Sequence, residues 1–278
     1  MFANNKQINI LNRNHLKYIV ILLMLFDHIF FFFPSNNPIR IIVSNISCIV
    51  APTMALFIAE GYHYTSDLKK YMGRLLLFAV ISYIPYILFF YGSLVPIHLY
   101  PEHMVPTFFS PSGETRLPPE VYIPFLNSTV VVLYTSVIFT LFLGLLSIYL
   151  WDKVNMPIYL KLAITLLIFW LAAFTSWRYY LILLCLIFYF LRDNPKKMWS
   201  AFFIVAFLIM FNVMLFKNPF QLKFAMEFDI YNVGILLVPL FFALYNGKSG
   251  KKSTFNKWFF YIFYPLHLLI LGLIRILI

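Results

Sequence analysis

Residues 17–33 read KYIVILLMLFDHIFFFF, an apolar run interrupted by one acid and one histidine. A helix that crosses a membrane needs about 20 mostly apolar residues. Similar runs follow along the rest of the chain, at residues 39–60, 72–92, 127–150, 158–174, 177–191, 198–216, 229–246 and 257–278. We therefore expect an all-α fold, a polytopic transmembrane helical bundle of about nine spans. It would form one integral membrane domain over residues 1–278.

The composition supports this fold class and excludes several others. Of the 278 residues, 62% are hydrophobic and 11% are charged, whereas a soluble domain carries about 25% charged residues. A chain of this length has no core large enough to hide so much apolar surface from water. A soluble enzyme, a nucleic-acid-binding protein and a disulfide scaffold are excluded, and the lipid bilayer is the expected partner. The two cysteines lack the spacing of a zinc site, so we expect no metal.

The net charge of +11 predicts an orientation in the membrane. Lys and Arg accumulate in cytoplasmic loops of membrane proteins. With the N-terminus in the cytoplasm, 15 of the 21 Lys and Arg residues fall on the cytoplasmic side. The other six are Arg40, Arg116, Arg178, Lys217, Lys223 and Arg275. We therefore expect a multi-pass protein of the cytoplasmic membrane, with the N-terminus inside and the C-terminus outside.

One connection is much longer than the others. Residues 93–126, between the third and fourth expected spans, are rich in proline and would lie outside the membrane on the extracytoplasmic face. Connections of this length are usually functional or disordered. The segment is either a cap over an exterior opening or a tolerated insertion.

Three ionisable side chains are expected near the middle of the bilayer, where such groups are costly and usually functional. Asp27 lies ten residues beyond Lys17 and His28 follows it, which places both about 15 Å from the cytoplasmic edge. His267 lies ten residues beyond Lys257, at the same depth of about 15 Å. The two histidines are therefore expected to share one pocket.

Adjacent residues on a helix point about 100° apart, so Asp27 and His28 do not face one another. We expect Asp27 to pair with a group on another helix, while His28 or His267 faces a substrate. The alternative is a buried polar cluster that only holds the helices together.

A second set of candidates lies where the second span reaches the cytoplasm. Glu60, Tyr62, Lys70 and Arg74 surround this mouth, where an anionic, nucleotide-containing donor would find several cations. The ordinary excess of positive charge in cytoplasmic loops explains the lysines equally well. At the outer start of the eighth span, Asp229 and Tyr231 either cap the helix or line an exterior acceptor site.

Several of these segments resemble the TraX family of membrane proteins, which is linked to N-terminal acetylation of F-type pilin. The stretches that carry the resemblance are LKYIVILLMLFDHIFFF, APTMALFIAEGYHYTSDLKKYMGRLLLFAVISYIP, TSVIFTLFLGLL, FDIYNVGILLVPLFFALY and KWFFYIFYPLHLLIL. The resemblance implies a bacterial, polytopic acetyltransferase that uses acetyl-CoA as its donor. It also implies that the family's functional residues correspond to Asp27, His28, Glu60, Arg74 and His267 of this sequence.

The resulting hypothesis is acyl transfer within the membrane. Acetyl-CoA would dock near Lys70 and Arg74, and a histidine at mid-depth would act as general base or carry the acetyl group. The acceptor would be an exported protein, peptide or glycan that offers an amine or a hydroxyl. Two other classes stay open: a proton-coupled transporter that uses these acids and histidines as a relay, and a non-catalytic accessory protein of conjugation or surface assembly.

Overall fold

The computed structural model describes residues 10–91, 97–101, 108–109, 115–116, 120–123, 128–132, 135–212, 214–218, 221–225, 228–248, 250–251 and 253–277. Most of the long expected connection at residues 93–126 lies outside these described residues, so its role as a cap stays a prediction.

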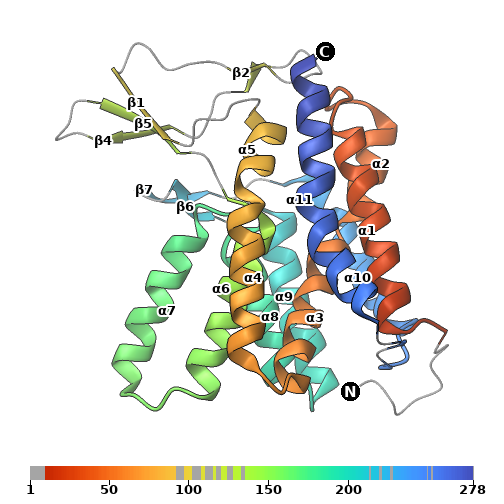
Figure 1. Cartoon of the computed structure of the whole chain (residues 1–278). Coiled ribbons are helices and arrows are strands. Elements are labelled where there is room, and N and C mark those ends of the chain that lie inside the picture. Colours follow the sequence, from red (N-terminus) through yellow and green to blue (C-terminus); the bar gives the residue numbers. More distant parts are fainter. Residues whose placement is uncertain are drawn as a thin grey trace.

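Each of the nine apolar runs contains a helix (Figure 1). The helices are α1 (Arg13–Phe30), α2 (Pro38–Ser47), α3 (Val50–Tyr64), α4 (Leu68–Ile81), α5 (Tyr83–Tyr91), α6 (Val137–Asp152), α7 (Ile158–Ala172), α8 (Arg178–Phe190), α9 (Pro195–Met210), the 3-10 helix η2 (Ile230–Leu237), α10 (Val238–Ala243) and α11 (Thr254–Leu277). The prediction of a helical protein is confirmed for these runs.

Three helical stretches of the described chain are long and apolar enough to cross a membrane. They are Pro38–Tyr64, Leu68–Phe90 and Thr254–Leu277, with 27, 23 and 24 residues. The first joins α2 to α3, because the two residues between them keep helical backbone angles. The first helix, α1, has 18 residues but carries Arg13, Lys17 and Asp27. The number of spans and their orientation stay predictions.

Short strands occupy parts of the connections, which the sequence analysis did not expect. The strands are β1 (Ile97–Pro101), β2 (Phe108–Phe109), β3 (Thr115–Arg116), β4 (Glu120–Ile123), β5 (Ser128–Val132), β6 (Met214–Asn218) and β7 (Gln221–Ala225). β5 pairs antiparallel with β1 and β4, and β6 pairs with β7. The fourth and seventh runs are therefore helical over less than the expected 127–150 and 198–216. In β5 the sequence is STVVV, and β-branched residues favour extended backbone.

The ends of the helices gather at two opposite ends of the bundle (Figure 1). The lower end in this view holds the start of α1. There the Arg13 N–H donates a hydrogen bond to the Lys248 carbonyl oxygen. The same end also holds the junctions of α3 with α4 and of α6 with α7, and Tyr62 reaches from α3 to Asp152 of α6. The upper end holds the strands and the end of α11. The α3–α4 and α6–α7 connections, which carry Lys69, Lys70 and Lys153, thus lie at one end of the bundle, and the side of the membrane that this end faces stays a prediction.

The most deeply buried part of the core lies between α6 and α8, which α3 and α4 cover. A methyl group added at Gly144 of α6 would lie 2.6 Å from the Cys185 sulfur of α8, so this close approach requires glycine. By contrast, α7 lies at the edge of the bundle and exposes Leu162, Leu166 and Leu167. Such an apolar outer face suits a lipid environment and would be unfavourable in water.

Candidate functional site

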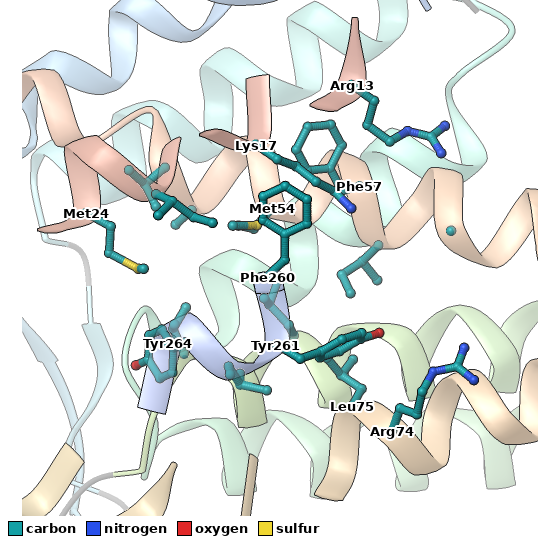
Figure 2. A pocket seen from close by; sticks show the side chains of 18 of the residues that line it. Arg13, Lys17, Met24, Met54, Phe57, Arg74, Leu75, Phe260, Tyr261 and Tyr264 are labelled. Atoms are coloured by element: carbon teal, nitrogen blue, oxygen red, sulfur yellow. The ribbon is translucent and has the colours of Figure 1, made fainter. Parts of the chain in front are cut away.

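A cavity of about 1320 Å³ lies inside the bundle. It is larger than the roughly 300–1,000 Å³ of most small-molecule sites. Its walls come from helices α1 to α6 and α11, and from the connections after α3, α7 and α10. Figure 2 shows its central part, where side chains of α1, α3, α4 and α11 converge.

One face of α1 supplies a continuous wall of this cavity. Arg13, Lys17, Ile21, Met24 and His28 all line it. Successive members of this set are three or four residues apart, which places them above one another on one side of a helix. From Lys17 to His28 the helix rises about 16 Å. One helix therefore joins a cationic region of the cavity to an imidazole.

Among the described residues, four cationic side chains line the cavity: Arg13, Lys17, Arg74 and Lys251. In Figure 2 Arg13 and Arg74 lie toward one end and Met24 and Tyr264 toward the other. The Arg74 guanidinium lies close to the Tyr261 hydroxyl. Its Nε atom is buried and has no hydrogen-bond partner among the described residues. A buried, unpaired donor of a charged group is costly unless a further acceptor binds it.

Glu60 fixes Arg13 at this end of the cavity. The Glu60 carboxylate lies 2.6 Å from Arg13 Nη2 and accepts a bond of 2.8 Å from Arg13 Nε. The Tyr245 hydroxyl, just beyond the end of α10, lies 3.1 and 3.0 Å from the two Glu60 oxygens. Glu60 is only 5% exposed and does not line the cavity. It therefore acts on the cavity through Arg13.

The two histidines that the sequence placed at one depth lie in contact. His28 Nδ1 is 2.8 Å from His267 Nε2, and the rings are stacked with their centroids 5.0 Å apart. His267 Nδ1 is 2.8 Å from the carbonyl oxygen of Phe263, one turn earlier on α11. His28 lines the cavity, whereas His267 lies behind it and is 4% exposed.

Asp27 turns toward a different helix from its neighbour His28. Its carboxylate lies close to Ser44 and Arg40 of α2, while it also reaches the cavity wall. The Arg40 guanidinium donates to the Phe33 carbonyl oxygen and lies over the Phe31 ring. The two adjacent polar residues of α1 therefore have separate partners, as the helical geometry requires.

Two expected donor-binding residues lie away from the cavity. The Tyr62 hydroxyl donates to Asp152 at 2.9 Å, and its ring packs against Tyr189 on α8. Lys70 is exposed and lies 3.0 Å from Asp67, the residue that caps α4. Hydrogen bonds from the Lys70 backbone and ammonium groups hold the pKa of Asp67 below its usual range. Of the four residues predicted at this mouth, the structure brings only Arg74 to the cavity wall.

Asp229 and Tyr231 also lie outside the cavity lining. The Asp229 side chain accepts a 2.9 Å bond from the Tyr231 N–H and so caps η2. The Tyr231 hydroxyl donates to the Ser35 carbonyl oxygen, which ties η2 to the connection between α1 and α2. These are the contacts of a helix cap, one of the two interpretations that the sequence left open. An acceptor site at these residues stays a prediction.

Sequence reasoning missed three of the four cations and both tyrosines of α11. Arg13, Lys17 and Lys251 were assigned only to the cytoplasmic charge excess, although the spacing of 13, 17, 21, 24 and 28 is a helical stripe. Tyr261 and Tyr264 stand three residues apart beside the predicted histidine. Within the described residues, no group of three His, Cys, Asp or Glu side chains comes together to hold a metal ion.

Comparison with known sequences gives one family. The sequence profile of the family described as "TraX protein" matches residues 12–109 and 121–275. A relative from Dichelobacter nodosus, described as "Probable fimbrial assembly protein FimC, serogroup H1", is 26% identical over 258 residues. The alignment covers 92% of this chain and 92% of the relative. No solved structure matches the chain. The matched ranges include both ends of the cavity.

Proposed function

The chain belongs to the TraX family, and from this premise we propose that it is a membrane-embedded acetyltransferase. The donor in this proposal is acetyl-CoA from the cytoplasm. The acceptor is an amine or a hydroxyl of a molecule exported across the membrane. Because the Dichelobacter nodosus relative is described as a probable fimbrial assembly protein, a pilin is the first acceptor to test, followed by other exported peptides and by surface glycans.

The observation that carries the proposal is one cavity that joins four cations to one imidazole. Acetyl-CoA combines an anionic nucleotide end with a long neutral arm that ends in a thioester. Guanidinium and ammonium groups recognise phosphates through charge-assisted hydrogen bonds. A neutral arm suits the apolar wall of Ile21, Met24 and Met54 that follows.

The residues at the cationic end fit such an anion. The cavity wall holds Arg13, Lys17, Arg74 and Lys251 but, among its described lining residues, only one acid, Asp27. Arg74 Nε is a buried donor without a partner in the described chain, and a phosphate oxygen would satisfy it. In this proposal Arg74, Arg13 and Lys251 hold the phosphates, and acetyl-CoA supplies the activated acyl group.

The chemistry assigned to the chain is general base catalysis by His28. Its imidazole would take the proton from the acceptor nitrogen or oxygen while that atom forms its bond to the acetyl carbon. As the carbon–sulfur bond breaks, the same imidazole would return the proton to the departing thiolate. Asp27, held by Arg40 and Ser44, would keep this part of α1 in place against α2.

The test is acetyl transfer by the full chain in nanodiscs, with labelled acetyl-CoA and a pilin N-terminal peptide or an amine acceptor. We expect label transfer that requires His28, and donor binding that requires Arg74. Donor binding without transfer in any acceptor assay would support a non-catalytic accessory protein. Transport driven by a proton gradient, without donor binding, would support a carrier instead. Either result contradicts the proposal.

A further inference from the structure

The two histidines differ in what they contact. His28 reaches the cavity wall, and its ring is otherwise covered by Phe89 and Phe90. His267 lies behind it, where Phe263 and Tyr264 cover its ring. Only one of the two imidazoles can therefore meet a molecule bound in the cavity.

The hydrogen bonds determine which nitrogen of each ring carries a proton. A carbonyl oxygen only accepts, so His267 Nδ1, 2.8 Å from the Phe263 oxygen, must carry a proton and donate it. In a neutral imidazole the other nitrogen is then an acceptor. His267 Nε2 therefore accepts, and His28 Nδ1, 2.8 Å away, must donate. This leaves His28 Nε2 with a lone pair.

The surroundings favour two neutral rings at rest. A charged His267 would reverse the bond between the rings, but the side chains around this pair are aromatic. The nearest acid on α1, Asp27, is already engaged by Arg40 and Ser44 of α2. An imidazolium without a counter-ion is costly at such a site.

We infer that His28 acts alone as the base, through Nε2, and that His267 is a positioning residue that fixes the tautomer of His28. This inference rests on the proposed function and deepens it, because it assigns different roles to two residues of the same site. The order of groups is the Phe263 carbonyl, His267 and His28, each holding the next by one hydrogen bond.

The arrangement also supports the proton transfer itself. When His28 Nε2 takes the proton of the acceptor, His28 becomes an imidazolium and its Nδ1–H donates more strongly to His267 Nε2. His267 stabilises this charge without meeting the substrate. When the proton leaves Nε2 for the thiolate, the resting pair is restored with no net change in either ring.

Two matched substitutions at position 267 separate positioning from direct participation. In H267Q the amide oxygen reaches the place of Nε2 and accepts from His28 Nδ1–H. In H267N the shorter amide reaches only the place of Nδ1 and leaves His28 without its acceptor. We expect H267N and H267A to lower kcat by about 10–100-fold, as loss of an orienting partner commonly does. H267Q should keep most of kcat, and KM for acetyl-CoA should stay unchanged in all three.

The tautomers are measurable without any activity. Imidazole nitrogen NMR of histidine-labelled protein in nanodiscs, with H28Q and H267Q to assign the signals, should find both rings neutral and protonated at Nδ1. A His28 protonated at Nε2 would overturn the inference. Equal and complete loss of transfer in H267Q and H28A, with donor binding retained, would also overturn it, because His267 would then react directly. If the tautomers are as expected but the wild-type chain transfers no acetyl group, the proposed function is wrong, whereas the tautomers assigned to the two histidines are confirmed.

Discussion

The two ends of the cavity differ in how their polar groups are paired. At the histidine end each ring nitrogen but one has a partner in the described part of the chain, so a single atom, His28 Nε2, is left for chemistry. At the cationic end Arg13 is held by Glu60, but the Arg74 Nε donor has no partner in the described chain. The first end defines the place of one proton. The second holds excess positive charge for an anion, so substitutions there should lower donor affinity rather than the rate of the chemical step.

The largest effect is expected from His28→Ala. Loss of a positioned general base typically costs about 10²–10⁴-fold in rate, and binding of acetyl-CoA should be unchanged because the cations remain. Single-turnover transfer and equilibrium binding of labelled acetyl-CoA in nanodiscs measure the two quantities. His15→Ala is the matched control, since His15 is exposed and lies off the cavity wall. A loss of donor binding as large as the loss of rate would contradict the assignment of binding to the cationic end and of chemistry to the histidine end.

The contact between the two histidines could be predicted from sequence, and the reason is geometric. Each helix rises 1.5 Å per residue, and Lys17 stands eleven residues before His28 while Lys257 stands ten residues before His267. Counting residues from a cytoplasmic charge therefore gives the height of a side chain in the bilayer. The helical runs themselves were equally predictable, because apolar length is a strong signal in membrane proteins.

The face that each side chain occupies could not be predicted in the same way. In a soluble helix polar residues mark the outer face. Here apolar side chains point both to the lipid and to the core, so the 3.6-residue alternation of polar and apolar residues does not distinguish the two faces. Glu60 and Tyr62 are two residues apart and point to different neighbours, Arg13 and Asp152. The strand β5 was missed for a related reason. Its run of three valines extends an apolar segment, and short apolar runs do not distinguish strand from helix.

Arg74→Ala should have the next largest effect, on donor binding. A hydrogen bond to a charged group contributes about 1.5–3 kcal/mol, or roughly 10–150-fold in affinity. KM for acetyl-CoA should rise by this factor while kcat at saturation changes little. Arg74→Lys should recover part of the affinity, because lysine keeps the charge but not the planar fork. Arg192→Ala, which removes an arginine outside the cavity lining, is the control. A change in kcat alone would place Arg74 at the reacting atoms instead.

Glu60→Gln tests whether Arg13 depends on its buried partner. The amide keeps an acceptor for Tyr245 but removes the negative charge 2.6 Å from Arg13. Breaking a fully buried ion pair costs about 3–5 kcal/mol. Because the Arg13 side chain is 19% exposed, we expect a smaller loss of stability, about 1–3 kcal/mol. The unfolding temperature in nanodiscs and the affinity for acetyl-CoA should fall together.

The double variant shows whether this effect passes through Arg13. If Glu60 acts only by holding the guanidinium, Glu60→Gln should add no further loss of donor affinity to Arg13→Gln. Additive losses would mean that Glu60 itself meets the donor, as the sequence analysis expected. Comparison of the single and double variants thus distinguishes a residue that lines the cavity from a residue that acts behind it.

The smallest effect is expected from Lys70→Ala, and it distinguishes sequence reasoning from the structure most directly. The sequence placed Lys70 beside Arg74 at the donor's phosphates, whereas the structure pairs it with Asp67 outside the cavity lining. Exposed ion pairs contribute about 1 kcal/mol or less, so donor affinity should change by less than about fivefold. Equilibrium binding of labelled acetyl-CoA, measured beside Arg74→Ala, decides the question. A loss of affinity as large as that of Arg74→Ala would mean that the cationic end extends across the α3–α4 connection. The Lys70 side chain is 77% exposed, and it would contribute that much only if a bound anion covered it.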